Sequence, residues 1–398
     1  MLVPTIRFPG FTDEYEERPL SDFLSENKEK NRQNKYTKQD VKSVSGDYGV
    51  VNQIEFFGKS MAGADVSNYH VVHHNNIVYT KSPLKANPYG IIKCNTGTDG
   101  IVSTLYAVYY CNGEAVPEYV DYYFGYDKRV NKYLLPLVNI GAKHDMKVNN
   151  QDAISGSVFF PSVAEQKRVV EALNAYNERV KNQLSIIEAL EARRKGLLQQ
   201  IFSQEIRFKA DDGSEFPGWE SHAMGEFFTE RKEKAQGGEE LLSVTIANGV
   251  IRQANSDKRD NSSEDKSNYK RVMTGDMAYN TMRMWQGAEG VSYWDGIVSP
   301  AYTIIVPEDD VNAEFFMVLF KTYEALKQFT IYSQGMTSDQ WNLKFDIFAD
   351  LEFDVPCSEE QTKIVAFFKL LDKQIQIEKD KLEAIKQVKK GLLQQMFV

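Results

Sequence analysis

Apolar side chains recur at helical spacing along two long stretches of the chain, residues 161–202 and 356–397. At a constant offset of 195 residues the apolar positions match, as Val169 matches Ile364 and Leu173 matches Phe368. Both stretches end in the run K-G-L-L-Q-Q, whereas the polar residues between the apolar positions differ more freely. Each stripe predicts a long amphipathic helix, and the duplication predicts a molecule built on a two-fold axis.

The two predicted helices are suited to pair with each other. A helix of about forty residues is roughly 60 Å long, and it is not stable alone in water with one apolar stripe exposed. Because the two stripes have matching positions, we expect the helices to pair antiparallel about the two-fold axis. The residues assigned to this pairing are Val180, Ile187, Leu190, Leu197, Ile375, Leu382, Ile385 and Leu392.

A glycine lies inside each helical pattern near its end, at Gly196 and Gly391. Glycine in a helix interior costs about 1 kcal/mol relative to alanine. The close approach of another backbone would explain both glycines, and a frayed helix end is the alternative.

The repeat extends beyond the helices, at offsets that drift between 195 and 208. Matching segments are F-P-G-F at 8–11 with F-P-G-W at 216–219, residues 20–30 with 224–234, 43–53 with 243–253, and 99–103 with 295–299. Small loop insertions therefore separate two copies of one fold. The start of the chain resembles the segment that follows the first long helix, so we expect the N-terminus to lie beside the C-terminus.

Each half of the chain mixes strands with helices. Alternating β-branched and aromatic residues predict strands at 105–110 and 302–306, and amphipathic patterns predict helices at 118–134 and 313–329. The predicted fold class is α+β, with two similar mixed α/β domains separated by two long helices. The predicted boundaries are 1–160 for the first domain, 161–203 for the first helix, 204–355 for the second domain and 356–398 for the second helix.

The composition indicates an ordinary water-soluble protein, with 42% apolar and 26% charged residues. Three scattered cysteines, Cys94, Cys111 and Cys357, favour neither a disulfide framework nor a zinc site. The first residues lack the pattern of a signal peptide, and no apolar run is long enough to span a membrane. We therefore expect a cytoplasmic protein.

The formal net charge of −9 describes the chain as a whole, so it does not exclude local binding of nucleic acid. DNA affinity depends on local basic patches, and cations outnumber carboxylates in the runs 28–42, 128–147 and 266–283. A solvated surface face is the alternative explanation for any one of these runs.

Motifs for catalysis are missing from the sequence. It contains neither a G-x-x-x-x-G-K-[ST] phosphate loop nor a G-x-G-x-x-G fingerprint. Asn87-Pro88-Tyr89 lacks the second proline of the methyltransferase element N-P-P-[YF], so a simple turn is favoured. His70, His73 and His74 invite a metal site, but without other ligands at suitable spacing a structural or loop role is favoured. The sequence is typical of a reader or a scaffold.

Three motifs in combination resemble the specificity subunits of type I restriction-modification systems. They are P-x-x-x-E-Q at 161–166 and 356–361, the two K-G-L-L-Q-Q runs, and the R-F…F-P-x-W lead-in. The resemblance implies two target recognition domains, each reading half of a bipartite, asymmetric DNA target. It implies that the long helices form an antiparallel coiled coil that sets the spacer between the half-sites.

The resemblance also implies partners and cofactors. Two methylation subunits dock on such a chain and carry S-adenosylmethionine, and two restriction subunits supply ATP-driven translocation and cleavage with Mg²⁺. The specificity subunit itself holds no cofactor, no metal and no catalytic residue. A protein-binding coiled-coil adaptor, and a methyltransferase or nuclease in its own right, are the alternatives.

Base readout needs donors and acceptors on loops that can enter a groove. In the second half we assign the loop 280–286, with Asn280, Arg283, Trp285 and Gln286, and the loop 332–340, with Gln334, Thr337 and Ser338. The matching loops of the first half are 80–87, with Lys81, Ser82 and Lys85, and 141–147, with Lys143 and His144. Candidate phosphate contacts are Ser43, Ser45, Ser243 and Thr245.

Overall fold

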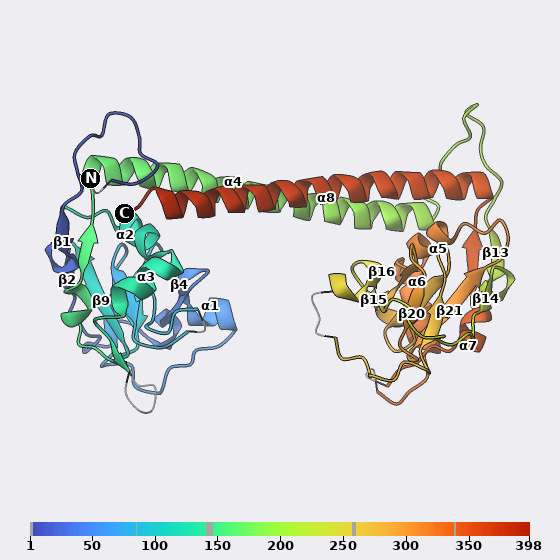
Figure 1. The fold of residues 1–398 in the computed structure, drawn as a ribbon, viewed down its shortest axis with the longest axis horizontal. Coiled ribbons are helices and arrows are strands. Elements are labelled where there is room, and N and C mark those ends of the chain that lie inside the picture. The colour runs from blue at the N-terminus through green and yellow to red at the C-terminus, as the bar shows by residue number, and fades with distance from the viewer. Residues whose placement is uncertain (1–2, 85, 141–145, 257–259, 338–339) are drawn as a thin grey trace. The chain divides into compact units, whose positions relative to one another are not determined.

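The chain forms two compact units in a computed structural model that describes residues 3–84, 86–140, 146–256, 260–337 and 340–398. The first unit contains residues up to 184 together with 380–398, and the second unit contains residues 185–379. Two long helices, α4 (Val163–Phe202) and α8 (Ser358–Gln395), each contribute to both units (Figure 1). Both helices lie where the repeat predicts them.

A run of buried and half-buried side chains on each long helix follows a heptad rhythm. In α4 it contains Leu173, Tyr176, Val180, Gln183, Ile187, Leu190, Arg194, Leu197 and Ile201, and in α8 it contains Phe368, Leu371, Ile375, Glu378, Leu382, Ile385, Lys389 and Leu392. Spacings of three and four alternate along both helices, which is the pattern of a left-handed coiled coil. All eight residues assigned to helix pairing belong to these sets.

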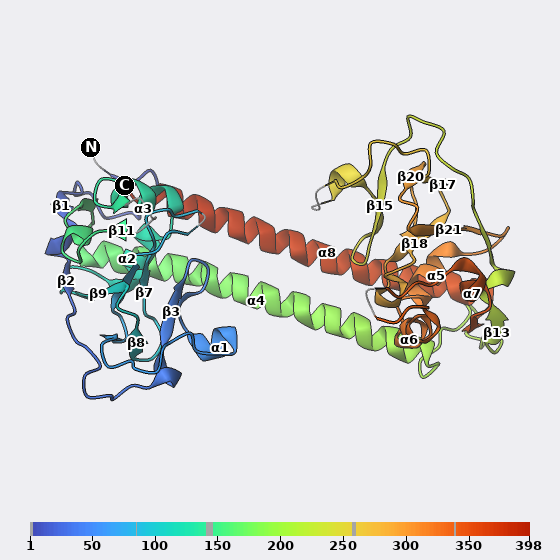
Figure 2. The same ribbon diagram turned by 90° about the horizontal axis from the view of Figure 1, so that it is seen from below.

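Within each unit, α4 and α8 run side by side in opposite directions (Figures 1 and 2). In the second unit Lys379 Nζ lies 2.7 Å from Glu191 Oε1, and Arg194 pairs with Asp372 one turn further along. In the first unit Leu392 packs against the core that contains the first turns of α4. The predicted antiparallel pairing is confirmed inside each unit.

Each unit contains a four-stranded antiparallel sheet with the same strand order. In the first unit the order is β2 (Leu24–Glu26), β9 (Tyr106–Cys111), β6 (Ile77–Thr80) and β7 (Ile92–Cys94). In the second unit it is β14 (Phe228–Glu230), β21 (Tyr302–Pro307), β18 (Met277–Asn280) and β19 (Glu289–Val291). The internal repeat is thus a repeat of topology.

Two-stranded pairs surround each sheet. The first unit has β1 (Glu17–Pro19) with β12 (Ser157–Phe159), β3 (Lys42–Ser45) with β4 (Gly49–Asn52), β5 (His70–Val72) with β8 (Gly100–Val102), and β10 (Asn139–Ile140) with β11 (Met146–Lys147). The second unit has β13 (Glu220–Ala223) with β22 (Glu352–Val355), β15 (Leu242–Thr245) with β16 (Gly249–Arg252), and β17 (Lys270–Val272) with β20 (Gly296–Val298). The short helices α1 (Gln53–Phe57) and α7 (Phe345–Ala349) lie at the edges.

The helices predicted at 118–134 and 313–329 are each broken in two, so the single-helix prediction is wrong. The first segment forms α2 (Pro117–Phe124) and α3 (Asp127–Leu134), with α2 ending at Gly125. The second forms α5 (Ala313–Leu319) and α6 (Tyr323–Tyr332), where the side chain of Thr322 accepts the backbone N–H of Ala325. These capping residues stop and restart the helix although the apolar pattern continues.

The chain termini meet in the first unit, as the sequence predicts. The backbone N–H of Ile6 donates to the carbonyl of Gln395 at 3.0 Å. In the second unit the N–H of Ile206 donates to the carbonyl of Gln200 at 3.1 Å. These two bonds are equivalent in the repeat. In the first unit the N-terminal segment bonds to the end of α8, and in the second unit the equivalent segment bonds to the end of α4, from which the chain continues directly.

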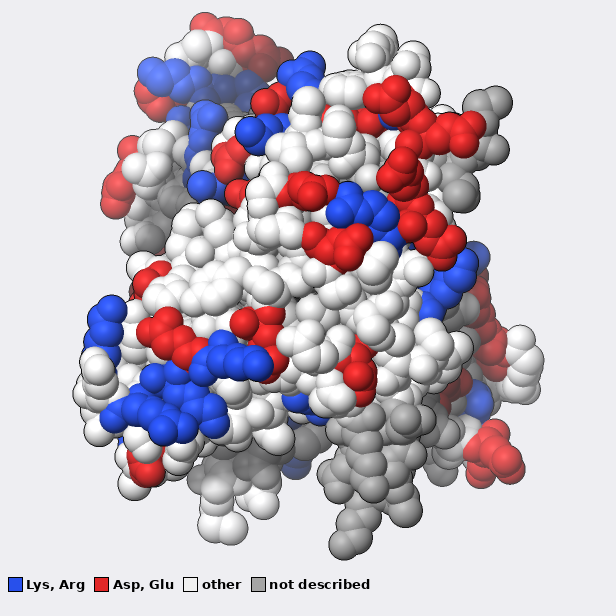
Figure 3. Space-filling model, turned by 90° about the vertical axis from the view of Figure 1, so that its left-hand side faces the viewer, with Lys and Arg blue, Asp and Glu red and all other residues white. Residues whose placement is uncertain are grey.

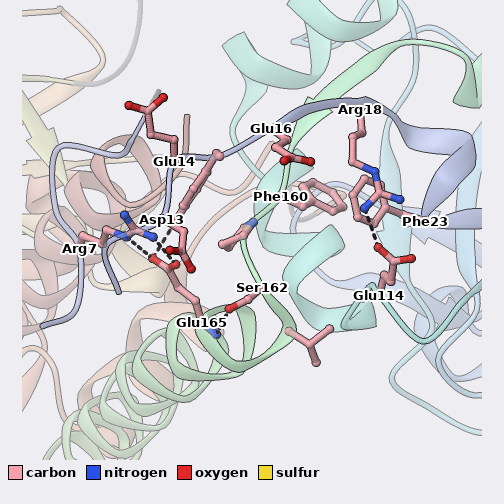
Figure 4. A pocket seen from close by; sticks show the side chains of 13 residues that line it. Arg7, Asp13, Glu14, Glu16, Arg18, Phe23, Glu114, Phe160, Ser162 and Glu165 are labelled. Carbon is pink, nitrogen blue, oxygen red and sulfur yellow. Dashed lines mark hydrogen bonds and ion pairs between the residues drawn. The ribbon is translucent and has the colours of Figure 1, made fainter. Parts of the chain in front are cut away.

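An arginine–glutamate pair fixes the start of each long helix. In the first unit Arg7 donates from Nε and Nη2 to the two carboxylate oxygens of Glu165, at 2.8 Å each (Figure 4). In the second unit Arg207 makes the same two bonds to Glu360, at 3.2 and 2.6 Å. The arginines come from the R-F motif and the glutamates from P-x-x-x-E-Q, so two separate motifs form one structural clamp.

The glutamine of the same motif closes the first turn of each long helix. Gln166 Nε2 donates to the carbonyl of Pro161, and Gln361 Nε2 donates to the carbonyl of Pro356, both at 2.9 Å. The close approach of another backbone does not explain the glycines near the other ends of the two helices. A Cβ at Gly196 would meet no heavy atom within 4 Å, and one at Gly391 would meet only a side-chain atom at 3.8 Å. No backbone approaches either glycine closely.

Candidate nucleic-acid interface

The hydroxyls predicted to contact phosphates lie on two equivalent hairpins, β3–β4 and β15–β16. Ser45 Oγ accepts the N–H of Tyr48 at 3.3 Å, and Thr245 Oγ1 accepts the N–H of Asn248 at 3.0 Å. Ser43 and Ser243 lie two residues before Ser45 and Thr245 on the same strands. Ser45 and Thr245 stabilise the hairpin turns, whereas Ser43 Oγ accepts the Nε2–H of Gln53 at 2.8 Å. Phosphate contacts by all four residues stay a prediction.

The two loops assigned to DNA in the second half come together. The N–H of Leu343 donates to the carbonyl of Thr281 at 2.9 Å. Gln334 and Asn342 exchange two backbone hydrogen bonds, at 3.0 and 2.8 Å. The ring centroids of Trp285 and Trp341 are 5.2 Å apart. The segments 280–286, 334–337 and 340–343 therefore lie close together.

Residues on this surface differ in what they can offer a ligand. Arg283, Gln334 and Thr337 are exposed, and Asn280 and Gln286 are half-buried. Trp285 donates its Nε1–H to the carbonyl of Met282 at 3.1 Å, so its main contribution is to hold the two loops together. Ser338 lies outside the described residues.

A cavity of about 350 Å³ opens beside these loops in the second unit. The carboxylate of Glu230 stands in it with 16% of its side chain exposed, 3.4 Å from Lys232 Nζ and 3.8 Å from Lys270 Nζ. Asn342 also lines the cavity, and its buried Oδ1 has no hydrogen-bond partner among the described residues. The cavity thus brings lysines together with an asparagine whose acceptor is unpaired.

In the first unit Lys81 and Ser82 follow β6, and both are half-buried. Burial lowers the pKa of Lys81, and the carboxylate of Glu26 opposes this shift. Burial is also the main reason that the pKa of His70 is lowered, with Lys30 and Lys81 adding to the effect. Of the other residues assigned in the first half, Lys85, Lys143 and His144 lie outside the described residues.

Two further histidines do not converge with His70 on a common site. His73 lies between two carboxylates, with Nδ1 2.7 Å from Asp99 Oδ2 and Nε2 2.8 Å from Glu29 Oε2. Hydrogen bonding to Asp99 is the main reason that the pKa of His73 is raised. Within the described parts of the chain, no group of three or more His, Cys, Asp and Glu residues could hold a metal ion.

Another cavity, of about 300 Å³, lies beside the clamp of the first unit (Figure 4). Its lining contains five carboxylates against two arginines: Asp13, Glu14, Glu16, Glu114 and Glu165, with Arg7 and Arg18. A polyanion would be repelled from this cavity. On this face acidic and basic side chains lie next to each other in several places (Figure 3).

Comparison with known proteins finds a family model that matches part of the chain. Residues 251–387 match the family model described as the type I restriction modification DNA specificity domain. The matched part, which reaches from β16 into α8, therefore resembles the DNA specificity domain of type I restriction-modification systems. No curated protein matches the sequence. Among the residues described, no helix is long and apolar enough to cross a bilayer.

Solved structures extend the likeness in fold to the whole chain. The HsdS subunit from Thermoanaerobacter tengcongensis is 14% identical with a TM-score of 0.51, over 98% of this chain and 97% of that one. The type I S subunit from M. genitalium is also 14% identical with a TM-score of 0.51, over 100% and 99%. A chain from a type I complex-assembly study is 15% identical with a TM-score of 0.56, over 99% of both.

The sequence analysis missed the cavity residues Glu230, Lys270, Asn342 and Lys344. One available signal was the run E-x-K-E-K, which is identical at 26–30 and 230–234 although most polar residues differ between the halves. The other residues reach the cavity from distant segments, and no local pattern marks them.

Proposed function

We propose that this specificity subunit is a cytoplasmic, non-catalytic DNA reader whose domains 1–160 and 204–355 each recognise one half of a bipartite, asymmetric target. The observation that carries the proposal is a duplicated sheet with unlike residues at equivalent places. His70 of β5 corresponds to Lys270 of β17, and Lys81 after β6 corresponds to Thr281 after β18. Equal folds with different polar groups suit two half-sites of different sequence.

We propose that the long helices set the spacer and dock two methylation subunits. The heptad rhythm supports a stiff coiled coil as the spacing element. Exposed apolar side chains on the helices support docking of a partner; they are Leu184, Ile186, Leu370, Ile377 and Val388. Two restriction subunits complete the proposed complex, and S-adenosylmethionine, ATP and Mg²⁺ belong to the partner subunits.

The test is to co-express this chain with the methylation subunits of its system and to map modified adenines across the host genome. We expect one motif with two unlike halves and a fixed spacer. A chimera in which residues 204–355 come from another specificity subunit should change one half and keep the other. The unmodified methylation subunits without this chain serve as the control.

Two results would remove the proposal. The first is methylation that shows no sequence preference in the complex, which would favour an adaptor that binds only proteins. The second is a chimera in which both halves of the motif change together, because independent reading by two domains would then be wrong. Methylation by the purified chain alone would favour the enzyme alternative.

A further inference from the structure

The identical run E-x-K-E-K occupies the same place in both units. Its glutamate, Glu26 or Glu230, is the last residue of the outer strand β2 or β14 of the four-stranded sheet. The next lysine points to solvent, since the side chain of Lys28 is 78% exposed and that of Lys232 is 79% exposed. An identical charged run in two otherwise divergent domains calls for a shared physical role.

The glutamates are sheltered and surrounded by donors. The side chain of Glu26 is 13% exposed and lies 3.9 Å from Lys28 Nζ, and it accepts the Nδ2–H of Asn150 at 2.6 Å. Glu230 lies between Lys232 and Lys270, as described above. The carboxylates therefore hold the neighbouring cations in place and are themselves largely screened from a ligand.

The same neighbour strand faces the run in both units. Backbone bridges join Lys30 to His70 in the first unit and Lys234 to Lys270 in the second. The run thus stands against a residue that differs between the copies. On the same side Lys81 of the first unit takes the place of Thr281 of the second, and each unit contributes an asparagine, Asn150 or Asn342.

Open hydrogen-bonding capacity lies on the variable side in both units. Among the described residues, Asn150 Oδ1, Asn342 Oδ1 and His70 Nδ1 are buried atoms without a hydrogen-bond partner. A buried acceptor without a donor is unfavourable, so such atoms indicate a place where water or a ligand supplies one. The exocyclic amines of adenine and cytosine are donors of this kind.

We propose that in each domain the E-x-K-E-K run is the constant side of a DNA site, where Lys28 or Lys232 binds a backbone phosphate while the variable side reads a base edge. Phosphates are the same in every sequence, which suits an identical run, and bases differ, which suits residues that differ between the domains. The inference rests on the proposed function and assigns its contacts to particular residues.

The local charge supports DNA as the occupant. The cavity of the second unit is lined by three lysines and two carboxylates: Lys232, Lys270 and Lys344 against Glu230 and Asp346. The cavity beside Arg7 has the opposite balance. An acidic segment of a partner protein is the competing occupant, and the experiment must separate it from DNA.

The experiment uses the complex of this chain with its methylation subunits and a duplex that carries the mapped motif. Lys28→Met and Lys232→Met should each weaken binding by roughly fivefold to tenfold for cognate and non-cognate duplexes alike. Each should also lower the slope of log affinity against log salt by about one phosphate contact, roughly 0.9. Lys209→Met is the matched control, because this exposed lysine is also ion-paired, with Glu215 at 2.6 Å.

The variable side is tested with Asn342→Leu. This change should relax discrimination at one base position of one half-site, by roughly tenfold or more, and should leave the other half-site unchanged. Thermal unfolding of each variant shows whether the fold is retained. Asn342→Ser serves as a second variant, which keeps a polar side chain but shortens its reach.

The outcomes separate the two proposals. If wild type methylates its motif but the lysine variants keep the affinity and salt slope of Lys209→Met, the DNA site is wrong while the proposed function stands. If the lysine variants lose assembly with the methylation subunits and retain DNA affinity, the occupant is a protein. If wild type shows no sequence preference, both proposals fall.

Discussion

The clamp that fixes each long helix gives the sharpest stability prediction. Glu360 has none of its side chain exposed, and its partner Arg207 is 22% exposed. In Arg207→Met the carboxylate keeps one side-chain donor, the Nε1–H of Trp219 at 3.1 Å. Breaking a buried ion pair on one side costs about 3–5 kcal/mol. Since water can partly replace the half-open arginine, we expect about 3 kcal/mol.

The double variant Arg207→Met with Glu360→Met tests the reason for that loss. Replacing both members of a buried pair by apolar residues is often close to neutral. We therefore expect the double variant to regain about 2 kcal/mol relative to Arg207→Met alone. The rescue distinguishes an orphaned charge from a simple loss of packing, which a second truncation would make worse.

Urea unfolding followed by tryptophan fluorescence is the assay. All 4 tryptophans, at 219, 285, 294 and 341, belong to the second unit, so the signal reports on that unit. Arg7→Met makes the equivalent change in the first unit, where the pair distances are 2.8 Å, and circular dichroism should show a similar loss. A cost below about 1 kcal/mol for Arg207→Met, or additive losses in the double variant, would refute the reasoning.

Three further predictions follow from other parts of the molecule. Gly196→Ala should raise the free energy of unfolding by about 0.5–1 kcal/mol, whereas Gly290→Ala should lower it because a Cβ there would lie 2.7 Å from another backbone; urea unfolding measures both, and a loss in Gly196→Ala would contradict the open space. Burial raises the pKa of Glu289 from 4.5 to about 7. The native state therefore keeps a proton that the unfolded chain releases, and stability should fall as pH rises from about 4.5 through 7. In the Glu289→Gln variant the melting temperature should fall less steeply as pH rises. Equal slopes of melting temperature against pH in variant and wild type would contradict the prediction. Deleting residues 181–187 and 376–382 together removes one heptad per helix, about 10 Å, and should shorten the mapped spacer by about three base pairs with both half-sites unchanged; an altered half-site would speak against the helices as the spacer.

Local pattern was sufficient for the elements that depend on it. The apolar stripes predicted α4 and α8 because the rhythm of a long helix is written along one continuous segment. The same reasoning failed at 118–134, where Gly125 ends α2 although apolar residues continue. The break lies at Tyr126, whose backbone is extended with φ −101° and ψ 114°. A periodicity argument does not register a change of backbone conformation at one residue.

The sequence likewise predicts only part of the candidate site. The side chain of Arg283 is exposed in the structure, as a residue that reads bases must be, and its contact with DNA stays a prediction. The meeting of Thr281 with Leu343, and of Glu230 with Lys270, joins segments that are far apart in the chain. Such meetings are fixed by sheet order and loop packing, which no local pattern encodes.

The sequence by itself determined that this protein is a duplication held on two long helices, because apolar periodicity and internal repetition are properties of the chain read in order. Only the tertiary structure decided that R-F and P-x-x-x-E-Q close on each other as buried ion pairs. It alone also placed E-x-K-E-K against residues that differ between the copies. The physical reason is that ion pairs and cavities form between surfaces brought together by folding, and their partners are chosen by distance in space.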